Sequence, residues 1–219
     1  MLKYRCLVLD HDDTVVQSEK TIAFPCFQKT LAEIRPGIQI TLEEYLTGCH
    51  NLGFVNMCRQ TYGFTDEELH REYLDWQEYI HTHIPAHFSG MENIIRRQKE
   101  SGGLLFVVSH SSQNTILRDY HAHFSIEPDG IYGCDLPPEK QKPSPYPLED
   151  IMARYSIQKE EILVVDDMKP AWEMARRKEV AIAFAAWGKT EFPFLCKEMQ
   201  ALCDFTFSSP QQLEAFLFP

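Results

Sequence analysis

Short apolar runs alternate with longer segments of helical spacing along the chain. Runs of four or five nearly continuous apolar residues are typical of parallel strands that are covered on both faces. These runs are Cys6–Leu9, Leu104–Val108, Ile162–Val165 and Ala181–Phe184. The helix-length segments are Met91–Glu100, Gln113–Phe124, Pro147–Tyr155 and Ala171–Lys178. The alternation predicts an α/β fold, a doubly wound parallel sheet with helices on both faces.

One long stretch departs from this alternation. Between the first and second predicted strands the sequence has helical patterns and no convincing strand, for example at Thr41–Leu46 and at Asp66–Ile80 after the candidate N-cap Thr65. Helical spacing within the second segment predicts a buried stripe of Leu69, Tyr73, Trp76 and Ile80. We therefore expect two domains, a core of residues 1–15 and 86–219 and a helical insert of residues 16–85.

Charge and composition narrow the range of partners. The 219 residues include 21 Lys and Arg against 32 Asp and Glu, a formal net charge of −11. Such a balance does not favour nucleic acid as a partner, and no apolar run approaches the ~18 residues of a membrane span. The seven cysteines are scattered without a Cys-x-x-Cys pair, which indicates a reduced, cytoplasmic compartment.

Polar residues follow three of the predicted strands, and a lysine lies in the loop before the helix that leads into the third of these strands. Ligands of an open parallel sheet bind beyond the carboxyl ends of its strands, so these residues are candidates for one site. They are Asp10, Asp12 and Thr14, then Ser109, then Lys142, and then Asp166 and Asp167. Because gathered carboxylates repel one another, the set favours a hard cation with oxygen ligands, such as Mg2+.

Two of these residues favour a phosphoryl ligand. Ser109 would supply a hydroxyl and Lys142 a positive charge. Taken alone, Ser109 would be a helix N-cap and Lys142 a solvated surface lysine. Only their shared context makes them candidate binding residues.

The order of these motifs resembles the haloacid dehalogenase superfamily. The resemblance spans nearly the whole chain, and its specificity comes from the combination of four motifs. They are Asp10-x-Asp12-x-Thr14, Ser109, Lys142-Pro143-Ser144-Pro145 and Asp166-Asp167. The helical insert resembles the α-helical cap of the phosphoglycolate phosphatase and β-phosphoglucomutase branch, in which the cap closes over the site and determines specificity.

The resemblance implies a role for each motif residue. Asp10 would be the nucleophile that forms an aspartyl-phosphate, and Asp12 the general acid and base. Asp167 would bind Mg2+ directly, with Asp166 at the neighbouring position. The metal set is then Asp10, Asp12 through its backbone carbonyl, Asp166 and Asp167. The substrate-binding set is Thr14, Ser109, His110 and Lys142, although His110 has an ambiguous position after Ser109.

Several positions leave alternatives open. Asp13 stands where most relatives have glycine, and it either lowers the affinity for highly charged substrates or only caps the turn. His50 and Asn51 are candidates for reading the substrate, in a segment expected to connect two cap helices; a plain turn capped by Asn51 is the alternative. His11 is expected to pack or to face the cap.

The expected activity is Mg2+-dependent hydrolysis of a small phosphorylated metabolite, by a monomer or weak dimer. Asp12 favours phosphate-ester chemistry because dehalogenases of this fold lack the second aspartate. A phosphomutase of the β-phosphoglucomutase type is an alternative that the sequence does not separate firmly. A phosphoryl-binding regulator is another, although in receiver domains the acid pair precedes the phosphorylated aspartate, whereas Asp10 comes first here.

Overall fold

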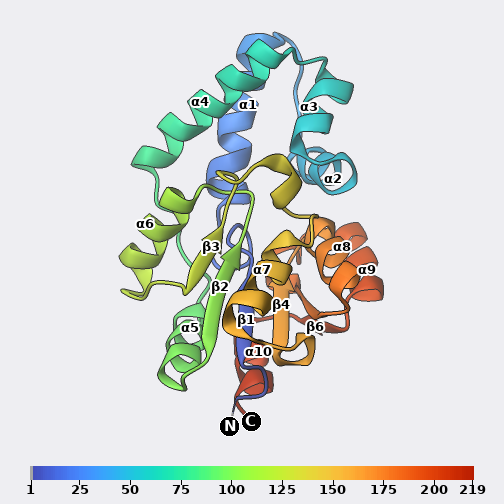
Figure 1. Ribbon diagram of the computed structural model, residues 1–219. Coiled ribbons are helices and arrows are strands. Elements are labelled where there is room, and N and C mark those ends of the chain that lie inside the picture. The colour runs from blue at the N-terminus through green and yellow to red at the C-terminus, as the bar shows by residue number, and fades with distance from the viewer. Residues whose placement is uncertain (1) are drawn as a thin grey trace. The chain divides into compact units, whose positions relative to one another are not determined.

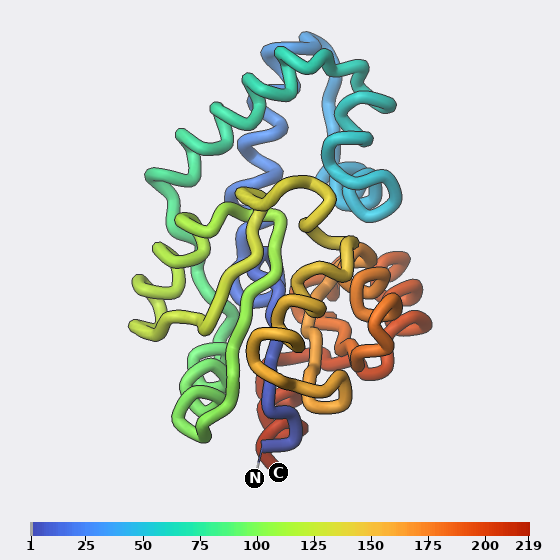
Figure 2. Tube along the Cα trace, in the orientation of Figure 1, coloured from blue at the N-terminus to red at the C-terminus, as the bar shows by residue number. Residues whose placement is uncertain are grey.

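The computed structural model describes residues 2–219, which form two compact units. The larger unit contains the chain up to Val16 together with His87–Pro219, and the smaller unit is Gln17–Ala86. Figure 2 traces the two connections between the units. The backbone N–H of Gln17 donates to the carbonyl of Ala86 at 2.8 Å. The first and last residues of the smaller unit therefore lie side by side.

The larger unit contains a six-stranded sheet in which every pairing is parallel. Its strand order is β3-β2-β1-β4-β5-β6 (Figure 1). The strands are β1 Cys6–Leu9, β2 Leu104–Val108, β3 Gly130–Tyr132, β4 Ile162–Asp166, β5 Ala181–Ala185 and β6 Phe205–Phe207. The predicted α/β fold is thus confirmed. The two strands that the sequence did not predict, β3 and β6, are the outermost and have only three residues each, too few for a hydrophobic pattern to stand out.

Helices cover both faces of this sheet. On one face α5 (Met91–Glu100), α6 (Gln113–His123) and α10 (Pro210–Leu217) pack on alternate strand residues such as Leu7 and Leu9. On the other face α7 (Tyr146–Tyr155) and α8 (Lys169–Lys178) pack on the intervening ones, such as Cys6 and Val8. The helix α9 (Pro193–Leu202) contacts β5 through Met199 and Phe184. Short helical turns complete the unit at η2 (Pro138–Lys140), η3 (Lys159–Glu161) and η4 (Ala186–Gly188).

The register of the central strands places their carboxyl ends at one edge. Cys6 of β1 lies beside Leu104 of β2 and Ile162 of β4, and the pairing continues in step to Leu9. The backbone N–H of Asp10 extends the ladder by donating to Val165 at 2.9 Å. The residues that follow β1, β2 and β4 are therefore held at the same edge.

The regular elements of the smaller unit, Gln17–Ala86, are all helical. They are a π-helical turn η1 (Glu19–Ala23) and the helices α1 (Phe24–Ile34), α2 (Leu42–Leu52), α3 (Phe54–Tyr62) and α4 (Asp66–Thr82). Phe27 of α1 is buried and makes ring contacts with four aromatic side chains of the same unit. These are Tyr45, Phe54, Tyr62 and Phe64.

The predicted loop at residues 47–51 is wrong, because these residues lie within α2. A capping box of Thr41 and Glu44 begins the helix, and Gly53, with φ of +75°, ends it. Gly48 does not interrupt the helix. A Cβ at Gly48 would overlap the side chain of Met57, so this glycine allows close approach of α2 and α3.

The predicted buried stripe of α4 is also wrong in part. Ile80 is buried, but Tyr73 is 40% exposed, whereas Glu72 is buried. The helix is rotated toward its acidic side because Arg35 makes two hydrogen bonds to Glu68, at 2.6 and 2.8 Å. Asp75 of the same face accepts a hydrogen bond from Thr30 of α1.

Within residues 2–219 no helix has both the length and the apolar character needed to cross a membrane.

Candidate active site

The loops at the carboxyl edge of the sheet bring a lysine between two carboxylates. Lys142 Nζ lies 2.6 Å from Asp10 Oδ1 and 2.6 Å from Asp166 Oδ2. Asp10 follows β1, Asp166 is the last residue of β4, and Lys142 lies in the loop before α7. All three side chains are buried, so each ion pair is shielded from solvent. The backbone N–H of Met168 also donates to Asp166, which fixes its carboxylate.

A second lysine bridges two further acids at this edge. Lys189 Nζ lies 2.6 Å from Asp13 Oδ2 and 2.8 Å from Asp167 Oδ2. The Thr14 hydroxyl donates to the other oxygen of Asp167 at 3.4 Å. Lys189 is only 1% exposed and follows the η4 turn after β5.

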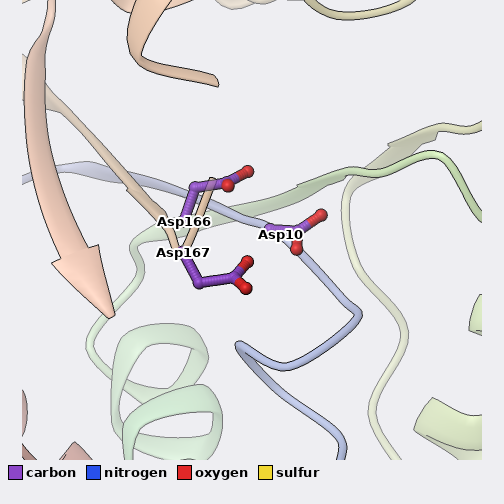
Figure 3. Close-up of side chains that lie close together, drawn as sticks. All are labelled: Asp10, Asp166 and Asp167. Carbon is purple, nitrogen blue, oxygen red and sulfur yellow. The ribbon is translucent and has the colours of Figure 1, made fainter. Parts of the chain in front are cut away.

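Three carboxylates form a group with the dimensions of a metal site. Asp10, Asp166 and Asp167 can each offer one oxygen such that all three atoms lie within 4.8 Å of one another. Figure 3 shows these side chains together at the ends of neighbouring strands. Buried oxygen donors at this spacing match the ligands that a hard divalent cation prefers.

The carboxylate of Asp12 is held by two serine hydroxyls. Ser109 Oγ donates to Asp12 Oδ2 at 3.1 Å, and Ser111 Oγ donates to the same oxygen at 2.7 Å. The backbone N–H of Ser111 donates in turn to Ser109 Oγ. The two serine hydroxyls of the turn after β2 thus orient the Asp12 side chain.

Burial and crowding set the ionisation of the group. Burial raises the pKa of Asp10 well above its usual range, and the neighbouring Asp166 raises it further, while Lys142 acts in the opposite direction. Burial likewise raises the pKa of Asp166 to about 6. For Lys142, burial lowers the pKa, but Asp10 and Asp166 outweigh it and the net shift is upward. The lysine therefore stays charged, and a bound cation would relieve the remaining crowding of carboxylates.

A sequence model of the haloacid dehalogenase-like hydrolases matches residues 7–185. The chain belongs to this family. The match covers most of the chain and both strand ends that carry the aspartates, and the resemblance inferred from the four motifs is thereby confirmed. A comparison with curated proteins gives no match.

Solved structures of other haloacid dehalogenase-like proteins share the fold over nearly the full chain. A putative hydrolase of this family from Bacteroides fragilis is 22% identical with a TM-score of 0.80, covering 96% of this chain and 100% of its own. A predicted phosphoglycolate phosphatase from Haemophilus somnus is 18% identical with a TM-score of 0.75, covering 99% of each chain. CbbY from Rhodobacter sphaeroides, solved with phosphate, is 17% identical with a TM-score of 0.75, covering 97% and 96%.

The structure of this family member brings most of the predicted site residues together. Asp10, Thr14, Lys142, Asp166 and Asp167 are connected by the contacts described above. Asp12 and Ser109 form a second pair, and the charge of Asp12 raises the pKa of Asp10. His110 is exposed, and its Nε2 lies 2.9 Å from the backbone carbonyl of Lys142. His50 and Asn51 belong to α2 of the smaller unit, where His50 is buried and Asn51 exposed. Their part in substrate binding stays a prediction.

His11 packs inside the larger unit. It is 1% exposed, and its Nε2 lies 3.0 Å from Asp119 Oδ2 of α6. Its ring stacks on Tyr120, and Arg118 forms an ion pair with the other oxygen of Asp119. Of the two expectations for His11, the packing role matches the structure.

Two residues of the site were missed by sequence reasoning. Ser111 lies two positions after Ser109 and carries no signal that separates it from Ser112. Lys189 could have been found, because it follows the strand predicted at residues 181–184, and the rule that ligands gather at strand ends applies there too.

Proposed function

We propose that this protein is a Mg2+-dependent phosphatase that hydrolyses a small phosphorylated metabolite through an aspartyl-phosphate on Asp10. The observation that carries the proposal is the pairing of Asp10 with Lys142 inside a group of buried carboxylates, next to an Asp12 held by hydroxyls. The phosphate present in the CbbY structure is consistent with this ligand class.

In the first half of the reaction, an oxygen of Asp10 attacks phosphorus. The bond between phosphorus and the ester oxygen breaks, and that oxygen leaves with a proton supplied by Asp12. An aspartate anhydride of phosphate remains on Asp10. Lys142 and Ser109 bind the phosphoryl oxygens; their hydrogen bonds to Asp10 and Asp12, the two aspartates that act on the phosphoryl group, support this assignment.

In the second half, Asp12 acts as the base. It takes a proton from a water molecule, whose oxygen attacks phosphorus, and the bond to Asp10 breaks to release inorganic phosphate. The carboxylate of Asp10 is restored. Ser111 keeps Asp12 in place in both halves because its hydroxyl donates to the carboxylate at 2.7 Å.

The group of Asp10, Asp166 and Asp167 would hold the Mg2+ ion. The donor set fits, because all three residues are buried and offer only oxygen, with ligand atoms no more than 4.8 Å apart. When bound, the ion supplies positive charge to the phosphoryl oxygens as negative charge develops on them.

We assign recognition of the leaving group to the smaller unit, Gln17–Ala86. The assignment rests on the position of this helical unit between β1 and β2 in the chain, where the family resemblance leads us to expect a cap. His50 and Asn51 remain its candidate recognition residues.

The test is phosphate release from a panel of sugar phosphates, phosphoglycolate and nucleotides, with and without Mg2+. We expect metal-dependent turnover of at least one ester, and its loss in Asp10→Asn. A matched control is Asp204→Asn, an exposed aspartate that accepts from Ile182 N at the opposite edge of the sheet. Turnover that survives in Asp10→Asn would exclude the covalent mechanism, and a wild-type protein inactive on every ester would overturn the proposal.

A further inference from the structure

The Lys189 ammonium repeats the arrangement of Lys142 on the other side of the carboxylate group. Lys142 joins Asp10 of the loop after β1 to Asp166 at the end of β4. Lys189 joins Asp13 of the same loop to Asp167, the next residue after β4. The four-motif pattern includes Lys142 and does not include Lys189. The second bridge is thus a feature of this chain that the proposed mechanism leaves unused.

Three contacts hold Lys189 in this position. Trp187 Nε1 donates to the carbonyl of Thr14 at 3.0 Å. A Cβ at Gly188 would overlap the Asp13 carbonyl, so glycine allows the η4 turn to lie directly on the loop after β1. The ion pair of Lys189 with Asp13 is the third contact. The ammonium is therefore fixed by the fold and is not a flexible surface charge.

Asp13 combines a left-handed backbone conformation with a buried carboxylate. Its φ is +53°, in the left-handed region where glycine is favoured, and its side chain is buried. A buried carboxylate is costly unless it is paired. Lys189 is that partner, and its ammonium also contacts the candidate metal ligand Asp167. The two expectations for Asp13 stay predictions.

Lys189 and Asp13 have opposite effects on the charge beside the candidate metal ligands. Lys189 lies 2.8 Å from Asp167 Oδ2, so it shares the carboxylate with a divalent cation and repels that cation. Asp13 offsets this repulsion by placing a negative charge on the same ammonium. Removing either partner changes the charge beside the metal ligands by one unit, with opposite sign.

We propose that Asp13 and Lys189 form a compensating ion pair that sets the affinity of the site for its divalent cation. The inference rests on the proposed Mg2+ site. A lysine without this acid would weaken the binding of the cation, and an acid without this lysine would strengthen it.

The experiment is titration of the whole protein with MgCl2 alone, measured by isothermal calorimetry at pH 7.5. We expect Asp13→Asn to weaken Mg2+ binding about tenfold or more, because unit charges a few ångströms apart in a protein interact by more than the equivalent of one decade. Lys189→Met should tighten binding, and the double variant Asp13→Asn/Lys189→Met should return to within about threefold of the wild type. Asparagine tolerates the left-handed backbone of residue 13.

Two controls separate charge from structure. Lys189→Arg keeps the charge and should bind Mg2+ close to the wild-type value. Lys99→Met removes a lysine paired with Asp129 at the amino end of the strands, and should leave Mg2+ binding unchanged. If Lys189→Met does not fold, Asp13→Asn and the double variant still decide the question.

The outcomes distinguish this inference from the proposed function. Single variants that shift Mg2+ affinity in the same direction, or an Asp13→Asn variant with wild-type affinity, would overturn the compensating pair while leaving the phosphatase proposal intact. A wild-type protein that does not bind Mg2+ even at roughly ten times the ~1 mM Kd of the weakest divalent-cation sites would overturn the metal site and with it this inference.

Discussion

At the scale of single residues, the position of the Asp12 carboxylate depends on Ser109 of the second motif and on Ser111, which belongs to none of the four motifs. Its oxygen Oδ2 accepts from both Ser109 and Ser111. A proton-transferring carboxylate is effective only when it is held within reach of the leaving oxygen. The adjacent Ser112 has a different task, since its hydroxyl accepts from Thr115 N and caps α6.

These two adjacent serines provide a matched test. We expect Ser111→Ala to lower kcat about tenfold, because one of two hydrogen bonds to a charged group is lost. Ser112→Ala should instead cost about 1 kcal/mol of stability through loss of the N-cap, with kcat nearly unchanged. Steady-state kinetics and urea unfolding of both variants measure the difference. Equal effects on kcat would show that Ser111 does not orient Asp12.

Residue types predicted which side chains lie together where a motif combines several of them. Asp10 and Asp167 were identified after apolar runs and Lys142 in the loop before a predicted helix, and the structure places the three in one connected group. Lys189 and Ser111 were missed because a single lysine or serine is common at surfaces and helix starts. Only spatial proximity distinguishes them.

At the scale of elements, α4 shows how polar contacts can override a hydrophobic pattern. Its apolar spacing predicted Tyr73 inside, yet the helix turns Glu72 inward and leaves Tyr73 exposed. The hydrogen bonds of Glu68 to Arg35 and of Asp75 to Thr30 lie on the same face as Glu72, at helical spacing. Burial, followed by the nearby Asp75, raises the pKa of Glu72 to about 7.

The raised pKa of Glu72 predicts a pH dependence of stability. Between about pH 4.5 and 7 the folded protein holds this proton and the unfolded chain does not, so the contribution of Glu72 to stability is lost as the pH rises through this window. We expect Glu72→Gln to be more stable than the wild type at pH 8, by on the order of 1–3 kcal/mol, and similar to it at pH 4.5.

Urea unfolding at several pH values measures this effect. The control is Glu78→Gln, an exposed glutamate on the same helix, which should follow the wild-type curve. A Glu72→Gln variant that loses stability in parallel with the wild type between pH 5 and 8 would show that Glu72 is already charged in the folded protein.

The two units differ in how closely their observed helices and strands agree with those predicted from the sequence. The helix α5 begins and ends where predicted, and the four predicted strands are the central ones of the sheet. In the smaller unit, the segment of His50 and Asn51 was expected to connect two helices, whereas it lies within α2, where Gly48 allows the close approach of Met57. A glycine that permits close packing and a glycine that ends a helix look the same in a sequence.

At the scale of the whole molecule, the proposed metal site would link cation binding to folding. The candidate ligands come from the loop after β1 and the end of β4, which meet only in the folded sheet. A cation that binds the folded state alone stabilises it by about 2.7 kcal/mol at one hundred times its Kd.

We therefore expect Mg2+ to raise the Tm by several degrees, at about 2–4 °C per kcal/mol for a chain of this size, and EDTA to reverse the rise. Differential scanning calorimetry measures the shift. Asp167→Asn should lose it, and Asp204→Asn should keep it. A shift of the same size in Asp167→Asn would place the Mg2+ ion elsewhere on the protein.

The amino-acid sequence alone determined the fold class, the family and the identity of the polar residues that follow the central strands. These properties depend on local hydrophobic period and on residue type next to a strand end. The tertiary structure decided the partners of each charge, such as Lys189 with Asp13 and Ser111 with Asp12, which lie far apart along the chain. The physical reason is that pairing energies depend on distance and burial in space, and separation in sequence does not specify either of them.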